Sequence, residues 1–265
     1  MLSNKFKFNY SVGAVANGVK TDTFTFFLLF FYSNIIGLNP GLAGSAIFIA
    51  LCIDAITDPL MGTISDRTNS SFGRRHPYMF ISFIPMSLGY ILLFAPRQEW
   101  DMSQTDLFIW MTIFTVITRI GMTLFDIPHR AFGGEVTKDY KERTILMSWR
   151  EMFAWVAGLS NAFLGYGVFF ASTPEFPQGQ LNPDVWFPFA LTGAAIMVFS
   201  VLYSSLSTKD EINSLSKWSG AISLIDIFHE LKIAIGNKSF LIFFFGNLFL
   251  SLAWGLSNTL TLFVN

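Results

Sequence analysis

The stretch LCIDAITDPLMGTISDRTNSSFGRRHPY, residues 51–78, places two acidic residues in an apolar helical run and follows them with a short basic loop. Asp54 and Asp58 are four residues apart, so both project from one face of a helix. The neighbouring segments, AGSAIFIALCI before and MFISFIPMSLGYILLFA after, are apolar enough to lie in lipid. Because charged side chains are costly inside a membrane, this pair is the strongest indication of function in the chain.

The composition indicates a membrane protein. The chain of 265 residues is 52% hydrophobic and 13% charged, whereas soluble domains contain about 25% charged residues. Its net charge of -1 provides no basic surface for nucleic acid, and the single residue Cys52 excludes an internal disulfide. We expect an all-α polytopic protein integral to the plasma membrane, in a bacterium the inner membrane, with the lipid bilayer as its surroundings.

Seven apolar runs are long enough to cross a bilayer, which takes about 20 residues. The runs are residues 11–36, 41–64, 78–96, 106–130, 145–171, 186–207 and 239–264. We expect an N-terminal six-helix domain at 1–207, a cytoplasmic middle loop at 208–238 with an amphipathic helix at 222–235, and a seventh span at 239–265. This odd number predicts that a second helical bundle lies outside the sequence and is required for activity.

Lys and Arg concentrate on one side of the predicted spans. The N-terminal segment, the end of the fourth span and the loops at 65–77, 131–144 and 208–238 hold 13 of the 17. Cytoplasmic loops are enriched in these residues, so the pattern predicts a cytoplasmic N-terminus. Trp100 and Trp186 flank spans on the opposite side, where an interfacial belt of aromatic side chains is expected.

Ionisable residues inside predicted spans are candidates for function because lipid disfavours their charge. They are Lys20, Asp22, Asp54, Asp58, Arg119, Asp126, Arg150 and Glu151. Each of them is alternatively part of a structural ion pair or closer to the membrane interface than the predicted spans indicate, and Arg119 can pair with an acid on a neighbouring span. Arg150 and Glu151 are adjacent, so we expect at most one of them to face a central cavity.

Asp54 and Asp58 suit a cation site. Two carboxylates this close repel each other unless a cation lies between them or one is protonated, so the pair indicates a hard-cation site or a proton carrier. Pro59 has no N–H, which leaves the carbonyl of Ala55 without its helical partner. Thr57 adds a hydroxyl, and broken helices with free carbonyls coordinate ions in transporters.

The fourth span repeats this pattern in the sequence GMTLFDIPHR. Asp126 is followed by Pro128, which frees the carbonyl of Leu124, and Thr123 supplies a hydroxyl. The second and fourth spans run in the same direction, so we expect these residues to face Asp54 and Asp58. His129 either relays a proton to Asp126 or lies at the membrane interface.

The basic loop after the second span suits a charged clasp that holds one conformation of a transporter. Its residues are Gly62, Asp66, Arg67, Gly73, Arg74 and Arg75. Gly62 would permit close packing of the helix end, and Asp66 would accept hydrogen bonds or an arginine. The alternative is that the positive charges only fix the topology.

These motifs resemble those of the glycoside–pentoside–hexuronide:cation symporters of the major facilitator superfamily. The stretch Asp54–Gly62 matches the family's D-A-I-x-D-P-x-M-G motif. The loop from Arg67 to Pro77, the fourth-span residues Met122, Thr123, Asp126, Ile127 and Pro128, and the segment DYKERT at 139–144, which ends the family's E-x-T-x-D-Y-x-E-R pattern, also match. The resemblance covers nearly all of the chain.

The resemblance implies the N-terminal six-helix bundle of a major facilitator transporter plus transmembrane helix VII. It implies a cation site at Asp54, Thr57, Asp58 and Thr123, which would hold the metal ion on Asp54 and Asp58 if Na⁺ is coupled. The implied activity is symport of a small solute, a sugar or another polar organic molecule, with Na⁺ or H⁺ by alternating access, without enzymatic activity or a further cofactor.

The implied substrate site includes Asp126 and Arg150, but the chain departs from the family at other positions. The Lys-Asp pair that binds sugar in melibiose transporters falls on Asn17 and Gly18, and their sugar-stacking tryptophan falls on Arg130. Lys20 and Asp22 lie near the displaced pair and are further candidates for substrate binding. The galactoside specificity therefore does not transfer.

Three other functions need weighing. A related branch of the family transports lysophospholipids with Na⁺. A seven-helix retinal receptor needs a lysine in its last span, and residues 239–264 contain none. A membrane enzyme needs a nucleophile or metal cluster, but HExxH and GxSxG are absent and the three histidines are far apart in the sequence.

Overall fold

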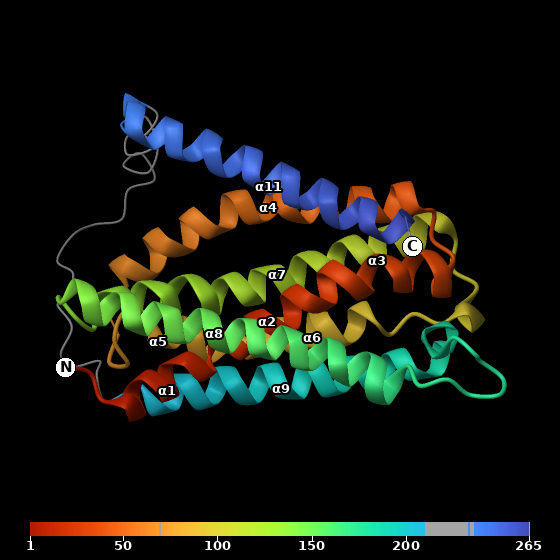
Figure 1. The fold of residues 1–265 in the computed structure, drawn as a ribbon, viewed down its shortest axis with the longest axis horizontal. Helices are drawn as coiled ribbons and strands as arrows, with labels where there is room; N and C mark the ends of the chain where they lie inside the picture. The colour runs from red at the N-terminus through yellow and green to blue at the C-terminus, as the bar shows by residue number, and fades with distance from the viewer. Residues whose placement is uncertain (69, 210–232, 234–235, 265) are drawn as a thin grey trace. The chain divides into compact units, whose positions relative to one another are not determined.

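The computed structural model describes residues 1–68, 70–209, 233 and 236–264. The chain divides into two compact units, Met1–Ser219 and Gly220–Asn265. All regular secondary structure among the described residues is helical, as Figure 1 shows, which confirms the predicted all-α class. The amphipathic helix predicted at 222–235 falls almost entirely outside the described residues.

The first predicted span is helical but irregular. It consists of α1 (Asn4–Val12), α2 (Ala14–Asp22), a π-helical segment (Thr23–Phe27), α3 (Leu28–Phe30) and a second π-helical segment (Phe31–Ile36). The run ends at Gly37, whose φ of 84° is a left-handed conformation that favours glycine. The helix thus starts earlier than the predicted residue 11, and its wider turns were not predicted.

The next five apolar runs form helices long and apolar enough to cross a membrane. These stretches are Pro40–Arg67, His76–Leu93, Gln104–Glu135, Tyr140–Phe169 and Pro183–Ser207. They contain α4 (Pro40–Arg67), α5 (His76–Ile81), α6 (Phe83–Leu93), α7 (Gln104–Glu135), α8 (Tyr140–Leu164) and α9 (Trp186–Ser207). In the second unit, α11 (Lys238–Val264) covers the seventh predicted run.

Capping side chains define where three of the long helices, α4, α7 and α8, begin. Asn39 accepts a hydrogen bond from the backbone N–H of Gly41 at 2.8 Å, and Pro40 occupies the first turn of α4. Ser103 forms a capping box at the start of α7, and Asp139 caps α8. Both α4 and α7 continue through their internal prolines, so these spans are not broken there.

Within the first unit, α7 packs between α4 and α6, and α2 packs against α8 and α9 (Figure 1). An aromatic cluster around Trp186 fills the end near the start of α9, where the rings of Phe170 and Trp186 are 4.6 Å apart. Trp186 is only 1% exposed. The prediction that it belongs to an interfacial belt is therefore wrong, because it packs inside the bundle.

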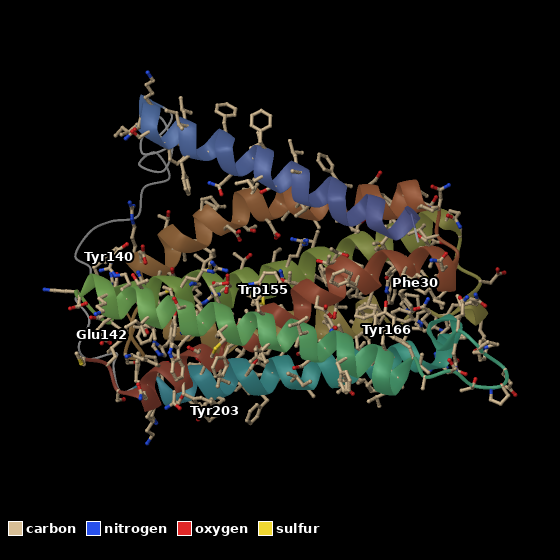
Figure 2. All side chains as sticks on the ribbon, viewed as in Figure 1. Phe30, Tyr140, Glu142, Trp155, Tyr166 and Tyr203 are labelled. Atoms are coloured by element: carbon tan, nitrogen blue, oxygen red, sulfur yellow. The ribbon has the colours of Figure 1, made fainter. Side chains whose placement is uncertain are left out.

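The outer faces of the helices are apolar. Figure 2 shows α8 with Tyr140 at one end, Trp155 near its middle and Tyr166 just beyond its other end. Trp155 is 64% exposed and Phe163 77% exposed. Large apolar side chains on the surface are costly in water but favourable against lipid, so this face suits the predicted bilayer.

Candidate cation and solute site

One small cavity of about 80 Å³ lies between α2, α4 and α7. Its lining residues are Asn17, Lys20, Asp54, Asp58, Arg119, Met122, Thr123, Asp126 and Ile127. Five of them were predicted as site residues from the sequence: Asp54, Asp58 and Thr123 for the cation, and Lys20 and Asp126 for the substrate. The structure brings members of both sets into one cavity.

Asp58 and Thr123 join the second and fourth spans directly. The Thr123 hydroxyl donates to Oδ1 of Asp58 at 2.7 Å. The expectation that these two spans face each other at the level of their acidic residues is confirmed. The roles of Asp58 and Thr123 as cation ligands stay predictions.

Asp54 is held by Arg119 in an ion pair. Nη1 of Arg119 donates to Oδ2 of Asp54, and the two side chains are only 13% and 20% exposed. The other oxygen of Asp54, Oδ1, is buried and has no hydrogen-bond partner in the described part of the chain. Thr57 turns its hydroxyl toward the carbonyl of Asp54 on its own helix at 3.5 Å.

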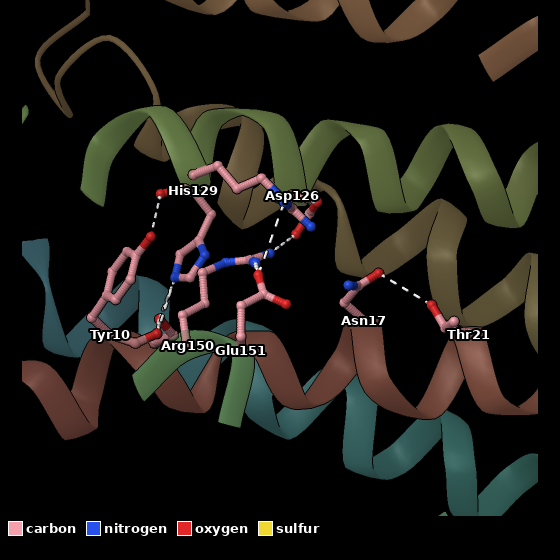
Figure 3. Close-up of polar contacts among 9 residues, drawn as sticks. Tyr10, Asn17, Thr21, Asp126, His129, Arg150 and Glu151 are labelled. Carbon is pink, nitrogen blue, oxygen red and sulfur yellow. Dashed lines mark hydrogen bonds and ion pairs between the residues drawn. The ribbon is translucent and has the colours of Figure 1, made fainter. Parts of the chain in front are cut away.

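Asp126 anchors a network of charges shown in Figure 3. Arg150 is fully buried and donates from Nη2 to Oδ1 of Asp126, and from Nη1 to Glu151 at 2.5 Å. Arg130 donates to the other oxygen of Asp126 at 2.7 Å. Arg150 and Glu151 do not line the cavity, but both reach its acid Asp126 through this network.

The two candidate residues on α2 lie in different surroundings. Lys20 lines the cavity, and its Nζ lies 6.0 Å from the centroid of the Phe24 ring. Asp22 is buried elsewhere and accepts a hydrogen bond from Nδ2 of Asn161 at 2.7 Å. Geometry therefore places Lys20, but not Asp22, beside the acidic residues.

Of the two roles that the sequence suggested for His129, the structure contradicts the interfacial one, and the proton relay to Asp126 stays a prediction. Its Nε2 lies 3.0 Å from the carbonyl oxygen of Tyr10 and 3.3 Å from the hydroxyl of Ser204. The Tyr10 hydroxyl donates to the carbonyl of His129 at 3.1 Å (Figure 3). Since His129 is fully buried, it does not lie at an interface, and it connects α7 to α1 and α9.

The clasp residues form a cluster between the ends of α4 and α7. Arg75 donates to Asp66 at 3.0 and 2.5 Å and to Glu135 at 2.9 Å, and Arg74 donates to Glu135 at 2.7 Å. Glu135 was missed, although it begins the family's E-x-T-x-D-Y-x-E-R pattern. Gly73 supports the turn with a φ of 78°.

Gly62 and Arg67 complete the predicted clasp. A Cβ on Gly62 would lie 3.7 Å from Cγ2 of Ile127, which is an ordinary contact. The close packing that Gly62 was predicted to permit therefore does not depend on a glycine at this position. Arg67 is the last residue of α4, where a positive charge complements the helix dipole.

A model of the family described as MFS/sugar transport protein matches residues 9–265, nearly the whole chain. The chain belongs to this family. Among similar proteins, the inner membrane symporter YicJ of Escherichia coli is 31% identical over 164 residues, which are 62% of this chain and 35% of the relative. The uncharacterized symporter YnaJ of Bacillus subtilis is 30% identical over 235 residues, 86% of this chain and 48% of the relative.

Two other relatives of the chain have names that mention substrates. The putative glycoside/cation symporter YagG of Escherichia coli is 31% identical over 159 residues, 60% of this chain and 34% of the relative. A sodium-dependent lysophosphatidylcholine symporter 1-A of Danio rerio is 28% identical over 171 residues, 62% of this chain and 31% of the relative. The chain spans about a third to a half of the length of the curated relatives that it matches.

Proposed function

We propose that the protein is a cation-coupled secondary active transporter that imports a sugar or another polar organic solute by alternating access. The coupling cation is Na⁺ or H⁺. One observation carries this proposal: Asp54 and Asp58, predicted to bind the cation, line the same cavity as Lys20 and Asp126, predicted to bind the solute. A cation bound there can act directly on the solute's ligands, as coupling requires.

The mechanism follows from the cost of burying charge. Closing the cavity over Asp58 without a cation would desolvate its carboxylate without compensation. A bound cation removes that cost and draws α4 and α7 together, which positions Asp126 and Lys20 to hydrogen-bond a polar solute. A cavity of about 80 Å³ is small, so the solute must enter in a more open conformation.

A sugar is the favoured solute class for two reasons. The family is described as sugar transport proteins, and the relative YagG is named as a putative glycoside/cation symporter. The cavity also offers both donors and acceptors, from Asn17, Lys20 and Asp126, and the hydroxyls of a sugar need both.

Transport of a lysophospholipid is the second candidate. An apolar groove of about 610 Å³ lies between α2, α8 and α9, with Val15, Val19 and Met152 among its lining residues. Such a groove suits an acyl chain, and the relative from Danio rerio is named for a lysophospholipid. The polar cavity is the better match for the charges on α4 and α7, so we favour a polar solute.

Uptake by the full-length protein in proteoliposomes tests the proposal. Labelled hexoses, pentoses, glycosides and lysophosphatidylcholine are offered with an inward Na⁺ gradient, an inward H⁺ gradient, or neither. We expect saturable accumulation of a polar solute driven by one gradient. Accumulation of lysophosphatidylcholine alone would favour the second candidate, and gradient-independent behaviour for all solutes would reject cation-coupled transport.

A further inference from the structure

We infer that Arg119 is the resident counter-ion of Asp54 and takes the place beside that carboxylate where a coupling Na⁺ would bind. Transport then does not require Na⁺, and a proton gradient is the driving force that remains. The inference rests on the proposed function, because it chooses between the two coupling cations. It concerns Arg119, for which the sequence left two alternatives, a functional residue or a member of a structural ion pair.

Arg119 and Thr123 form two parallel contacts with the acidic pair. Arg119 and Thr123 are four residues apart on α7, and Asp54 and Asp58 are four residues apart on α4. Arg119 binds Asp54, and Thr123 binds Asp58. Because residues four apart lie on one face of a helix, the guanidinium is part of the same α4–α7 interface as the predicted cation ligands.

The ligands of this site fit a bound Na⁺ poorly while Arg119 is in place. A sodium ion needs several oxygen ligands, and one oxygen of Asp54 is already used by the guanidinium. The free oxygen Oδ1 of Asp54 is buried, so a sodium ion there would share one carboxylate with Arg119. Two positive charges this close repel each other strongly away from bulk water.

A second cation strengthens this repulsion. Lys20 lines the same cavity, and Cζ of Arg119 lies 5.4 Å from the centroid of the Phe24 ring that Lys20 also approaches. Lys20 and Arg119 therefore both lie close to the same aromatic ring. An alkali ion that entered the cavity would be repelled by the positive charges of both side chains.

Among the residues that the structure describes, the charges of the cavity and its attached network balance. The cationic members are Lys20, Arg119, Arg130 and Arg150, and the anionic members are Asp54, Asp58, Asp126 and Glu151. A bound Na⁺ would add a positive charge to this set and would also need several oxygen ligands, whereas a proton adds its charge by bonding to a single carboxylate oxygen and needs no other ligand.

Direct binding of radiolabelled Na⁺ to the full-length protein in nanodiscs tests the inference. The proteins compared are the wild type, Arg119→Gln, Arg119→Lys and Arg97→Gln, a matched control that removes an exposed arginine outside the cavity. We expect saturable Na⁺ binding at millimolar concentrations only in Arg119→Gln, with an affinity at least about tenfold above that of the wild type. Arg119→Lys keeps the charge and should behave like the wild type.

Two results would overturn the inference. One is saturable Na⁺ binding to the wild type that Asp54→Asn abolishes. This comparison of the wild type with Asp54→Asn tests the inference even if Arg119→Gln does not fold. The other is a folded Arg119→Gln whose Na⁺ affinity equals that of the wild type. Solute uptake is measured in parallel to distinguish the two claims. Absence of gradient-driven uptake by the wild type would contradict the proposed function, whereas the Na⁺-binding comparison tests only the role of Arg119.

Discussion

Replacing Arg150 with methionine should cost much of the stability of the helical bundle. Arg150 is fully buried, and its guanidinium bonds both Asp126 and Glu151. Methionine keeps an apolar stem of similar length but leaves the carboxylate of Asp126 without this partner. Glu151 is 51% exposed and can be solvated, so the loss is dominated by Asp126, which is 15% exposed.

The magnitude follows from the partners that remain. Breaking a buried ion pair by removing one partner costs about 3–5 kcal/mol. Arg130 still donates to Asp126 at 2.7 Å, and its side chain is 48% exposed, so it compensates in part. We therefore expect Arg150→Met to lower the free energy of unfolding by about 3 kcal/mol, at the low end of that range.

Equilibrium unfolding of the purified protein in mixed micelles, titrated with a denaturing detergent and followed by tryptophan fluorescence, measures this loss. Arg143→Met is the matched control, because Arg143 is an exposed arginine on the same helix and should change stability by less than about 0.5 kcal/mol. Adding Asp126→Asn to Arg150→Met removes the buried carboxylate that has lost Arg150 as its partner, and it should recover about 1–2 kcal/mol. A loss below about 1 kcal/mol, or no recovery in the double variant, would refute the buried-pair reasoning.

Two further predictions use the same unfolding assay. Gly18→Ala should cost about 1–3 kcal/mol, because its Cβ would lie 2.1 Å from the Ala154 carbonyl oxygen. Gly44→Ala, with open space around it, should be nearly neutral, and equal effects would contradict the packing argument. Arg75→Ala should cost only about 1 kcal/mol and less at high salt, because the Asp66 and Glu135 side chains are 47% and 36% exposed. A larger, salt-independent loss would show that the clasp is shielded from water.

Most of the helices could be predicted from the sequence because lipid-compatible runs and their capping residues are local features. The run predicted at 41–64 is α4 from Pro40 to Arg67, started by Asn39, and the run at 106–130 is α7, started by the capping box at Ser103. The π-helical segments at Thr23–Phe27 and Phe31–Ile36 were missed. No local pattern marks them, since wider turns are set by packing against neighbouring helices.

Five residues of the cavity were predicted as site residues from the sequence, and the facing of Thr123 and the acidic pair was predicted too, but the ion pair of Arg119 with Asp54 was not. Spacing alone placed Asp54 and Asp58 on one face, and the shared direction of the two spans placed Thr123 opposite them. The partner of Arg119 depends on how α4 and α7 are rotated against each other, which sequence spacing does not determine. Asp22 shows the same limit, because only the packing of α2 on α8 decides that it meets Asn161.

Uptake by Asp58→Asn is the measurement that tests the central claim most directly. Asparagine keeps the shape and the hydrogen bond to Thr123 but removes the carboxylate that we propose holds the coupling cation. Asp101→Asn is the matched control, because Asp101 is exposed and its φ of 45° suits asparagine. We expect gradient-driven accumulation of solute to fall at least about tenfold in a folded Asp58→Asn protein and to persist in Asp101→Asn. Cation-dependent uptake that stays at the wild-type level in Asp58→Asn would contradict the account.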